Sequence, residues 1–140
     1  MAQASIKIEG VDKLVKKLGM AAAISTLRPP MEQSVQLLER DMAFEPPPRR
    51  GSSYIRGYGY PGRPATSEHL SQSWTTKVTP TPNGLEGKIG NPTSYGPWVQ
   101  SQQFQAWMHK GRWRTDQQVM SKNRKQITEL FRQAIDRALR

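Results

Sequence analysis

Residues 72–91, QSWTTKVTPTPNGLEGKIGN, decide the fold because they predict a β-hairpin. Apolar or small residues alternate with polar ones at 74–78 and again at 85–89, which is the period of strands that bury one face. The Asn83-Gly84 pair between the two runs favours a turn that needs positive φ. We therefore expect two antiparallel strands joined by a short turn.

The amino-terminal part of the chain adds a third strand and a short helix to this hairpin. Residues 4–9 alternate isoleucine with polar residues, which predicts a half-buried strand. Residues 12–18 place Leu and Val at helical spacing, and Gly19 stands where a helix commonly ends. We expect the strand to join the hairpin in a small antiparallel sheet.

A long helix from about residue 28 to residue 44 is expected to pack on this sheet. Thr26 is the expected cap, and Pro29 and Pro30 fit the first turn because the amide donors that they lack have no partner there. Apolar residues then recur at spacings of three and four, which favours core packing over a ligand site. This stripe comprises Met31, Val35, Leu38 and Met42.

A second long helix is expected from about residue 116 to residue 139. Thr115 and Gln118 have the spacing of a capping box, and Asp116 places a negative charge in the first turn, where the helix dipole favours it. The expected buried stripe comprises Val119, Ile127, Leu130, Phe131, Ala134, Ala138 and Leu139. Together these elements predict one α+β domain over residues 1–140.

Between the first long helix and the hairpin, residues 45–66 predict a long loop or arm. Pro, Gly, Arg and Tyr dominate this stretch, and it has no apolar periodicity. We expect a flexible arm at 46–66, followed by one helical turn at 67–73. Long loops in a compact domain are usually functional or become ordered on binding, so we expect the arm to take part in a contact. Interleaved Tyr and Arg suit either the bases of single-stranded nucleic acid or a neighbouring subunit.

The other unusual stretch is YGPWVQSQQFQAWMHKGRWRT, residues 95–115, which holds five of the eleven aromatic residues of the chain. We expect a short helical turn at 95–100 and a hairpin-like excursion at 104–113 with Gly111 at its bend. Aromatic rings supply rigid contact area and Arg supplies planar donors, so the segment suits a buried core, a ligand pocket or a docking surface. Composition leaves these three readings open.

The formal net charge of +10 is concentrated in residues 46–140, which hold fifteen basic and five acidic residues. Two basic patches, one in the arm and one near 110–125, would attract polyanions through phosphate neutralisation and counterion release. The alternative is a solvated face that keeps the protein soluble. The ten basic residues of the two patches are Arg49, Arg50, Arg56, Arg63, Lys110, Arg112, Arg114, Lys122, Arg124 and Lys125.

The sequence offers little support for catalysis or metal binding. Cysteine is absent, and the two histidines, His69 and His109, lack a second ligand at a metal-binding spacing. Glu68 beside His69 is the nearest approach to an acid-base pair, but adjacent residues often point apart. No apolar run reaches the roughly 20 residues that a membrane-spanning helix needs. We expect a soluble protein that is not an enzyme and uses no metal or cofactor.

Three segments resemble the tail-completion, head-tail joining protein family of tailed bacteriophages, which includes minor tail proteins at the neck. They are SEHLSQSW at 67–74, GNPTSYGPWVQ at 90–100 and QAWMHKGRWRT at 105–115. The order of features is also similar to that of the family: strand, short helix, long helix, loop bearing Gly and Arg, hairpin and terminal helix. Many members carry an acidic residue where this chain has Gln100, so a contact made by that acid is not expected here.

The resemblance implies a structural virion protein without catalytic activity, assembled in the cytoplasm of the bacterial host. It implies a ring of six subunits that completes the tail and joins it to the DNA-filled head. The implied partners are neighbouring neck proteins, such as the connector, stopper, tail terminator or tube protein. Basic residues facing the lumen, drawn from the ten named above, would contact passing double-stranded DNA without reading its sequence.

Closed rings use heterologous contacts, in which one patch of a subunit meets a different patch of its neighbour. With the resemblance in mind, the arm and the aromatic segment are the candidates for the two sides of such a contact. The candidate interface residues are Tyr54, Tyr58, Tyr60, Trp98, Phe104, Trp107 and Trp113.

Other functions stay open on the sequence alone. The charge and the arm also suit a free-standing nucleic-acid-binding protein, whose binding would weaken steeply with salt. An enzyme, for example a nuclease that uses Glu68 and His69, is a further alternative. Within the phage neck, a stopper or a tail terminator is an alternative to a completion ring, because several neck proteins are small, basic and α+β.

Overall fold

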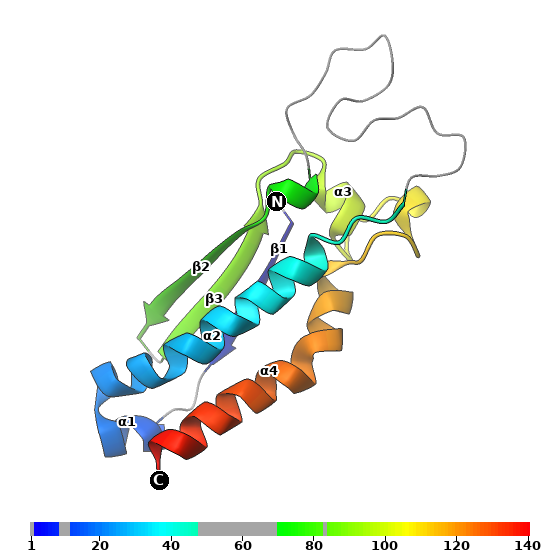
Figure 1. Cartoon of the computed structure of the whole chain (residues 1–140). Coiled ribbons are helices and arrows are strands. Elements are labelled where there is room, and N and C mark those ends of the chain that lie inside the picture. Colours follow the sequence, from blue (N-terminus) through cyan, green and yellow to red (C-terminus); the bar gives the residue numbers. More distant parts are fainter. Residues whose placement is uncertain (1, 9–11, 48–69, 83) are drawn as a thin grey trace.

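The computed structural model describes residues 2–8, 12–47, 70–82 and 84–140, which form the α+β fold that the sequence predicts (Figure 1). Strands β1 (Ala2–Ile8), β2 (Thr75–Thr81) and β3 (Gly84–Asn91) make one antiparallel sheet in the order β1-β3-β2. The predicted hairpin is confirmed. Because the amino-terminal strand pairs with the second strand of the hairpin, β3 lies at the centre of the sheet.

The two faces of the sheet differ in polarity. The register places Ile6 and Val78 on either side of Gly87, on the face that is buried. On the opposite face, the ammonium groups of Lys7 and Lys88 approach the Glu86 carboxylate at 3.4 and 3.3 Å. One face therefore packs in the core and the other is solvated, as is common for antiparallel sheets.

Helices α1 (Asp12–Leu18) and α2 (Met20–Met42) follow β1 and are separated by Gly19. Gly19 has a φ of 82°, a left-handed conformation that glycine adopts without steric cost. Its N–H donates to the carbonyl oxygen of Val15 at 2.7 Å, which closes the last turn of α1. The predicted helix end at Gly19 is confirmed.

The predicted start of the long helix near residue 28 is wrong, because α2 begins at Met20 and contains both Pro29 and Pro30. Thr26 is not a cap: its Oγ1 lies inside the helix and donates to the carbonyl oxygen of Ala22 at 2.9 Å. The turns before the prolines are rich in Ala, the best helix former, and Leu27 within them is fully buried. Local propensity and tertiary packing therefore both extend the helix ahead of the prolines, where the prolines alone predicted its start.

Helix α2 crosses the sheet closely at Gly87. A Cβ atom at that position would lie 2.6 Å from both Met31 Sδ and Val35 Cγ1. Only glycine permits this approach without a shift of the helix or the strand. Four long side chains of α2 are fully buried in the core beneath it: Leu27, Met31, Leu38 and Met42.

Helix α4 (Asp116–Ala138) lies beside α2 and also contacts β1 (Figure 1). The predicted capping box is confirmed. The Thr115 Oγ1 accepts a hydrogen bond from the Gln118 N–H at 3.2 Å, and Gln118 Oε1 accepts one from the Thr115 N–H at 3.0 Å. The helix start is therefore fixed by local side-chain chemistry.

The buried stripe of α4 is close to the predicted one. Val119, Ile127 and Phe131 are buried, whereas the predicted members Leu130, Ala134 and Ala138 are half-buried. Leu139 is 37 % exposed because it stands beyond the last helical residue, so its predicted burial is wrong. Asn123 is a buried polar member that the stripe did not include.

Three short elements gather near the carboxyl end of α2 (Figure 1): the 3₁₀ helix η1 (Leu70–Gln72), the helix α3 (Gly96–Gln100) and the 3₁₀ helix η2 (Trp107–His109). The predicted turns at 67–73 and 95–100 correspond to η1 and α3, although 67–69 lie outside the described residues. Of the predicted arm, only Pro46 and Pro47 are described. Within the described parts of the chain, no helix has the length and apolarity needed to cross a membrane.

Candidate interaction surface

The segment that follows α3 is folded into turns and η2, without the strand pairing of the predicted hairpin-like excursion at 104–113. Gly111 has a φ of 76°, so the predicted bend at that residue is confirmed. The Ala106 N–H donates to the carbonyl oxygen of Trp98 at 2.7 Å, which fastens the segment to α3. The Gln105 side-chain amide donates to the carbonyl oxygens of Val99 at 2.7 Å and Trp113 at 3.1 Å. A side chain thus replaces the backbone ladder that a hairpin would have used.

Four large apolar side chains of α3 and the braced segment after it are exposed to solvent. The exposed fraction is 78 % for Trp107, 57 % for Trp98, 49 % for Phe104 and 44 % for Met108. The rings of Trp98 and Phe104 pack edge to face, with centroids 6.2 Å apart and an interplanar angle of 67°. We call these four residues the aromatic surface. Large apolar side chains exposed within one short stretch of chain, here residues 98–108, are characteristic of protein interaction sites.

Trp113 does not belong to the aromatic surface, although the sequence places it with the same interface candidates. Only 9 % of it is exposed, and it forms a second small core with Leu70, Val99 and Tyr95. Its burial within its own subunit removes it as an anchor for a neighbouring one. The reading of the segment as core is therefore right for Trp113, while Trp98, Phe104 and Trp107 remain available for contact.

Gln100 connects this segment to the two long helices. The side chain is fully buried, and its Nε2 donates to the carbonyl oxygen of Met42 at 2.8 Å and to that of Arg114 at 3.1 Å. A carboxylate has no N–H and could donate neither bond. The amide of Gln100 thus has a structural role that an acid at this position could not fill.

A buried carboxylate with three neighbouring cations lies where α2 ends and α4 begins. The Asp41 carboxylate is 3.5 Å from Arg40 Nε, 3.6 Å from Arg114 Nη1 and 3.5 Å from Lys122 Nζ. Asn123 Nδ2 donates to it at 2.8 Å. We call Arg40, Arg114 and Lys122 the cation cluster. With three cations around one anion, the cluster carries a local excess of +2.

Asp41 remains ionised under ordinary conditions. Burial alone would raise the pKa of its carboxyl, but the hydrogen bond from Asn123 and the charges of Lys122 and Arg40 outweigh this effect and lower the pKa. The ionised carboxylate gathers the three cations while only partly neutralising them. Such a group of cations suits a phosphate-bearing partner.

The other predicted basic residues divide into three sets. Lys110, Arg124 and Lys125 are exposed. Arg112 donates from Nη2 to the carbonyl oxygen of Pro47 at 2.7 Å, so it ties the loop before α4 to the residues after α2. Four candidates fall outside the described residues: Arg49, Arg50, Arg56 and Arg63.

Arg40 and Asp41 were not among the predicted site residues, although the sequence carried a signal for Asp41. The aspartate lies three residues after Leu38 and next to Met42, on the stripe that was expected to be apolar. A charged residue on a buried stripe requires partners of opposite charge. The basic residues near the start of the second long helix were the nearest candidates.

The remaining sequence candidates cannot be placed in the structure. Tyr54, Tyr58 and Tyr60, and the adjacent Glu68 and His69, lie outside the described residues. Among the residues that are described, no group of three or more His, Asp or Glu side chains could hold a metal ion.

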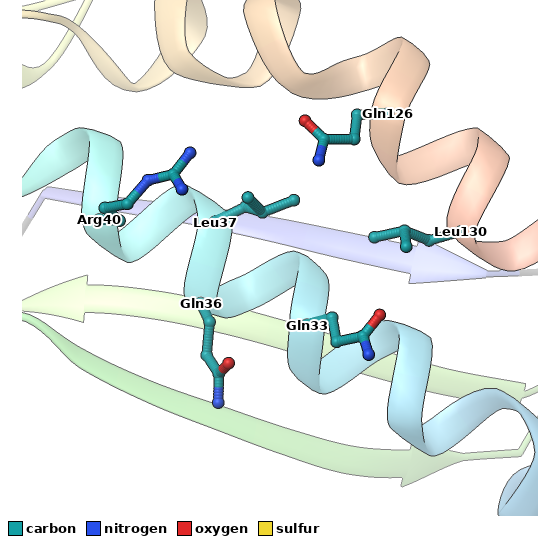
Figure 2. A pocket seen from close by; sticks show the side chains of 6 residues that line it. All are labelled: Gln33, Gln36, Leu37, Arg40, Gln126 and Leu130. Carbon is teal, nitrogen blue, oxygen red and sulfur yellow. The ribbon is translucent and has the colours of Figure 1, made fainter.

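A groove of about 390 Å³ runs between α2 and α4, on the opposite side of α2 from the buried stripe (Figure 2). Leu37 of α2 and Leu130 of α4 point toward one another across it, and Arg40 and Gln126 extend into the same space. Both leucines are half-buried. We call it the interhelical groove. Its lining residues are Gln33, Gln36, Leu37, Arg40, Gln126 and Leu130.

No protein-family model matches this chain, and no curated protein or solved structure matches it either.

Proposed function

We propose that this protein is a structural subunit of the neck of a tailed bacteriophage, which forms a ring that completes the tail and joins it to the DNA-filled head. The observation that carries the proposal is the aromatic surface. Two indole rings, a phenyl ring and a thioether are held in solvent by a segment whose backbone is braced by Gln105 and by α3. Tryptophans in such settings dominate the energy of protein interfaces.

The resemblance of the sequence to tail-completion proteins supplies the location in the virion and the ring. The ring would have six copies, and its partners would be the neck and tail proteins on either side. Virion location and assembly in the host cytoplasm belong to the same proposal. The proposal includes no catalytic step, because the function consists of binding alone.

The cation cluster supports a second element of the proposal, contact with double-stranded DNA. Arg40, Arg114 and Lys122 gather positive charge at one place on the surface, and exposed Lys125 adds to the charge of α4. Contacts of this kind neutralise phosphates and carry no sequence information, which suits DNA that must pass through a lumen.

The proposal is tested by producing phage particles without this protein and examining them by electron microscopy. We expect DNA-filled heads and separate tails that fail to join or that fall apart. Complementation with the wild-type chain should restore joined particles, which controls for effects on neighbouring genes. Normal infectious particles in the absence of the protein would refute a joining role. Heads that join a tail of the wrong length would instead indicate a tail terminator.

A free-standing nucleic-acid-binding protein is the second candidate, and the cation cluster favours it. In that case the monomer should shift a double-stranded DNA fragment in a gel at low salt, and binding should weaken steeply as salt rises. Exchange of Arg40 and Lys122 for Ala should reduce the dependence on salt. A monomer that shifts no DNA at low salt would exclude this second function and leave the first one standing.

A further inference from the structure

The chain carries an exposed aromatic surface and, in a different place, a groove between two helices. The aromatic surface belongs to α3 and the segment after it, whereas the interhelical groove lies between α2 and α4 (Figure 2). We propose that the groove of one copy receives Trp107 of a second copy of this chain, so that subunits join head to tail. This inference rests on the proposed function, since it names the two sides of the ring contact.

The lining of the groove fits an indole ring. Leu37 and Leu130 face one another and offer half-buried aliphatic surface to the faces of the ring. Gln126 extends into the groove and supplies an amide oxygen to accept the indole N–H. A tryptophan buries about 150 to 250 Å² when it is fully enclosed, so most of the hydrophobic gain would come from this one side chain.

Arg40 gives the groove an electrostatic preference for an aromatic occupant. Its side chain is 70 % exposed, and its guanidinium extends into the groove. A guanidinium over the negative face of an indole is attracted by the ring quadrupole, and Trp is the best of the aromatic residues for this contact. The chain already uses the same chemistry internally, where Arg114 lies 4.2 Å from the ring centroid of Phe44.

The occupant is a second copy because both halves of the contact are on one chain and do not overlap. Trp107 belongs to η2, whereas the groove is formed by residues 33–40 and 126–130. Two different patches that fit one another generate a heterologous contact, and a heterologous contact closes into a ring when the rotation between subunits allows it. A contact of the aromatic surface with itself would be two-fold and would stop at a dimer.

Self-association and DNA binding should respond to salt in opposite directions. Every copy carries a net charge of +10, so copies repel one another at low ionic strength. An apolar and cation-π contact must overcome this repulsion, which salt screens. Raising the salt concentration from low to moderate should therefore strengthen association of the chain with itself, while it weakens association with DNA.

The test uses two variants of the full chain and their mixture. Trp107→Ala lacks the protruding ring but keeps the groove, and Leu37→Asp has a charged groove but keeps the ring. Analytical ultracentrifugation should find the wild-type chain assembled and each variant monomeric, with association at least about 30-fold weaker, as expected for loss of an interface hot spot. The equimolar mixture should form a dimer and nothing larger, because it contains one intact contact per pair.

Several outcomes would overturn the inference. If Leu37→Asp assembles like the wild type, the aromatic surface pairs with itself or with another part of the neighbour. If the mixture stays monomeric, or if the wild-type chain never associates, the groove does not receive the ring. Met20→Ala, an equally simple change at an exposed apolar residue far from both surfaces, is the control and should assemble normally.

Folding defects in the groove variant are excluded by a second variant and by a second measurement. Arg40→Met keeps an unbranched apolar stem but removes the guanidinium, so it should weaken association less than Leu37→Asp does. Thermal unfolding of each variant should match that of the wild-type monomer. If the association experiments contradict the groove contact, the joining role still stands, because particles without the protein would still fail to join heads to tails.

Discussion

Trp107 and Trp113 belong to the same short segment, yet their surroundings are opposite. Trp107 is 78 % exposed, whereas Trp113 is 9 % exposed and packs with Leu70 and Val99. Between them the backbone turns at Gly111, where φ is 76°. The segment therefore has two functions divided between two tryptophans: one side chain holds it to the fold, and the other is presented to solvent.

The largest effect on stability is expected for Trp113→Ala. Removal of a buried tryptophan leaves a cavity, and substitutions of this kind cost about 3 to 5 kcal/mol. Urea unfolding of the variant and the wild type gives the difference in the free energy of unfolding. Trp113→Phe retains most of the packing and should cost clearly less. A cost below about 1 kcal/mol for the alanine variant would mean that the two tryptophans do not differ as described.

A smaller effect is expected for Asp41→Ala, which removes the acceptor of the Asn123 hydrogen bond and leaves the cation cluster without its anion. Hydrogen bonds to charged groups contribute about 1.5 to 3 kcal/mol. Asp41→Asn keeps an acceptor for Asn123, so it should be less harmful. Both variants should leave the surroundings of the four tryptophans unchanged, which the fluorescence emission of the protein would report. A loss of association equal to that of Trp107→Ala would contradict the separation of the two regions.

The contribution of Asp41 to the free energy of unfolding should decrease as the pH falls. Because the pKa of its carboxyl is lower in the folded protein than the ordinary value of 3.8, the stabilisation is present above that value and is lost as the pH falls through the folded pKa. The difference in stability between the wild type and Asp41→Asn should be constant from pH 7 to pH 5 and should shrink below about pH 4. A difference that persists unchanged at pH 2 would exclude an electrostatic origin.

Gln100→Ala tests the link between the two regions and should cost about 1 to 3 kcal/mol, since it leaves two carbonyl oxygens without their donor. These oxygens belong to Met42 at the end of α2 and to Arg114 just before α4. Because the same amide holds α3, the variant should also weaken association of the chain with itself. Gln103→Ala, at an exposed position nearby, is the matched control and should change neither quantity. Normal stability in Gln100→Ala would mean that water replaces the amide.

Local features of the fold could be predicted from the sequence because they depend on neighbouring residues. The capping box of Thr115 and Gln118, the bend at Gly111 and the alternation of the hairpin strands each follow from a few adjacent positions. The start of α2 could not be predicted in this way. Its first turns are held by burial of Ala23 and Leu27 against the core, and this contact outweighs the preference of prolines for a first turn.

The candidate site was predicted only in part, because it also depends on tertiary contacts between residues far apart in the sequence. Composition marked residues 95–115 as a surface or a core, but the choice between Trp107 and Trp113 depends on tertiary contacts with Leu70 and Val99. The cation cluster combines Arg114 and Lys122, which were predicted, with Arg40, which was not. Arg40 stands on a different helix, and its proximity follows from the packing of α2 against α4.

The smallest effect on stability, and the largest on association, is expected for Trp107→Ala. A side chain that is 78 % exposed makes few contacts within its own subunit, so its removal should change the free energy of unfolding by no more than about 0.5 kcal/mol. Measured side by side, Trp113→Ala should lower the free energy of unfolding, whereas Trp107→Ala should lower association and leave the free energy of unfolding almost unchanged. If Trp107→Ala destabilised the monomer as much as Trp113→Ala does, the indole of Trp107 would be part of the core. The aromatic surface would then lose its main exposed side chain. If Trp107→Ala changed neither stability nor association, the exposed indole would have no partner among copies of this chain. The contact between neighbouring subunits would then involve another part of the surface.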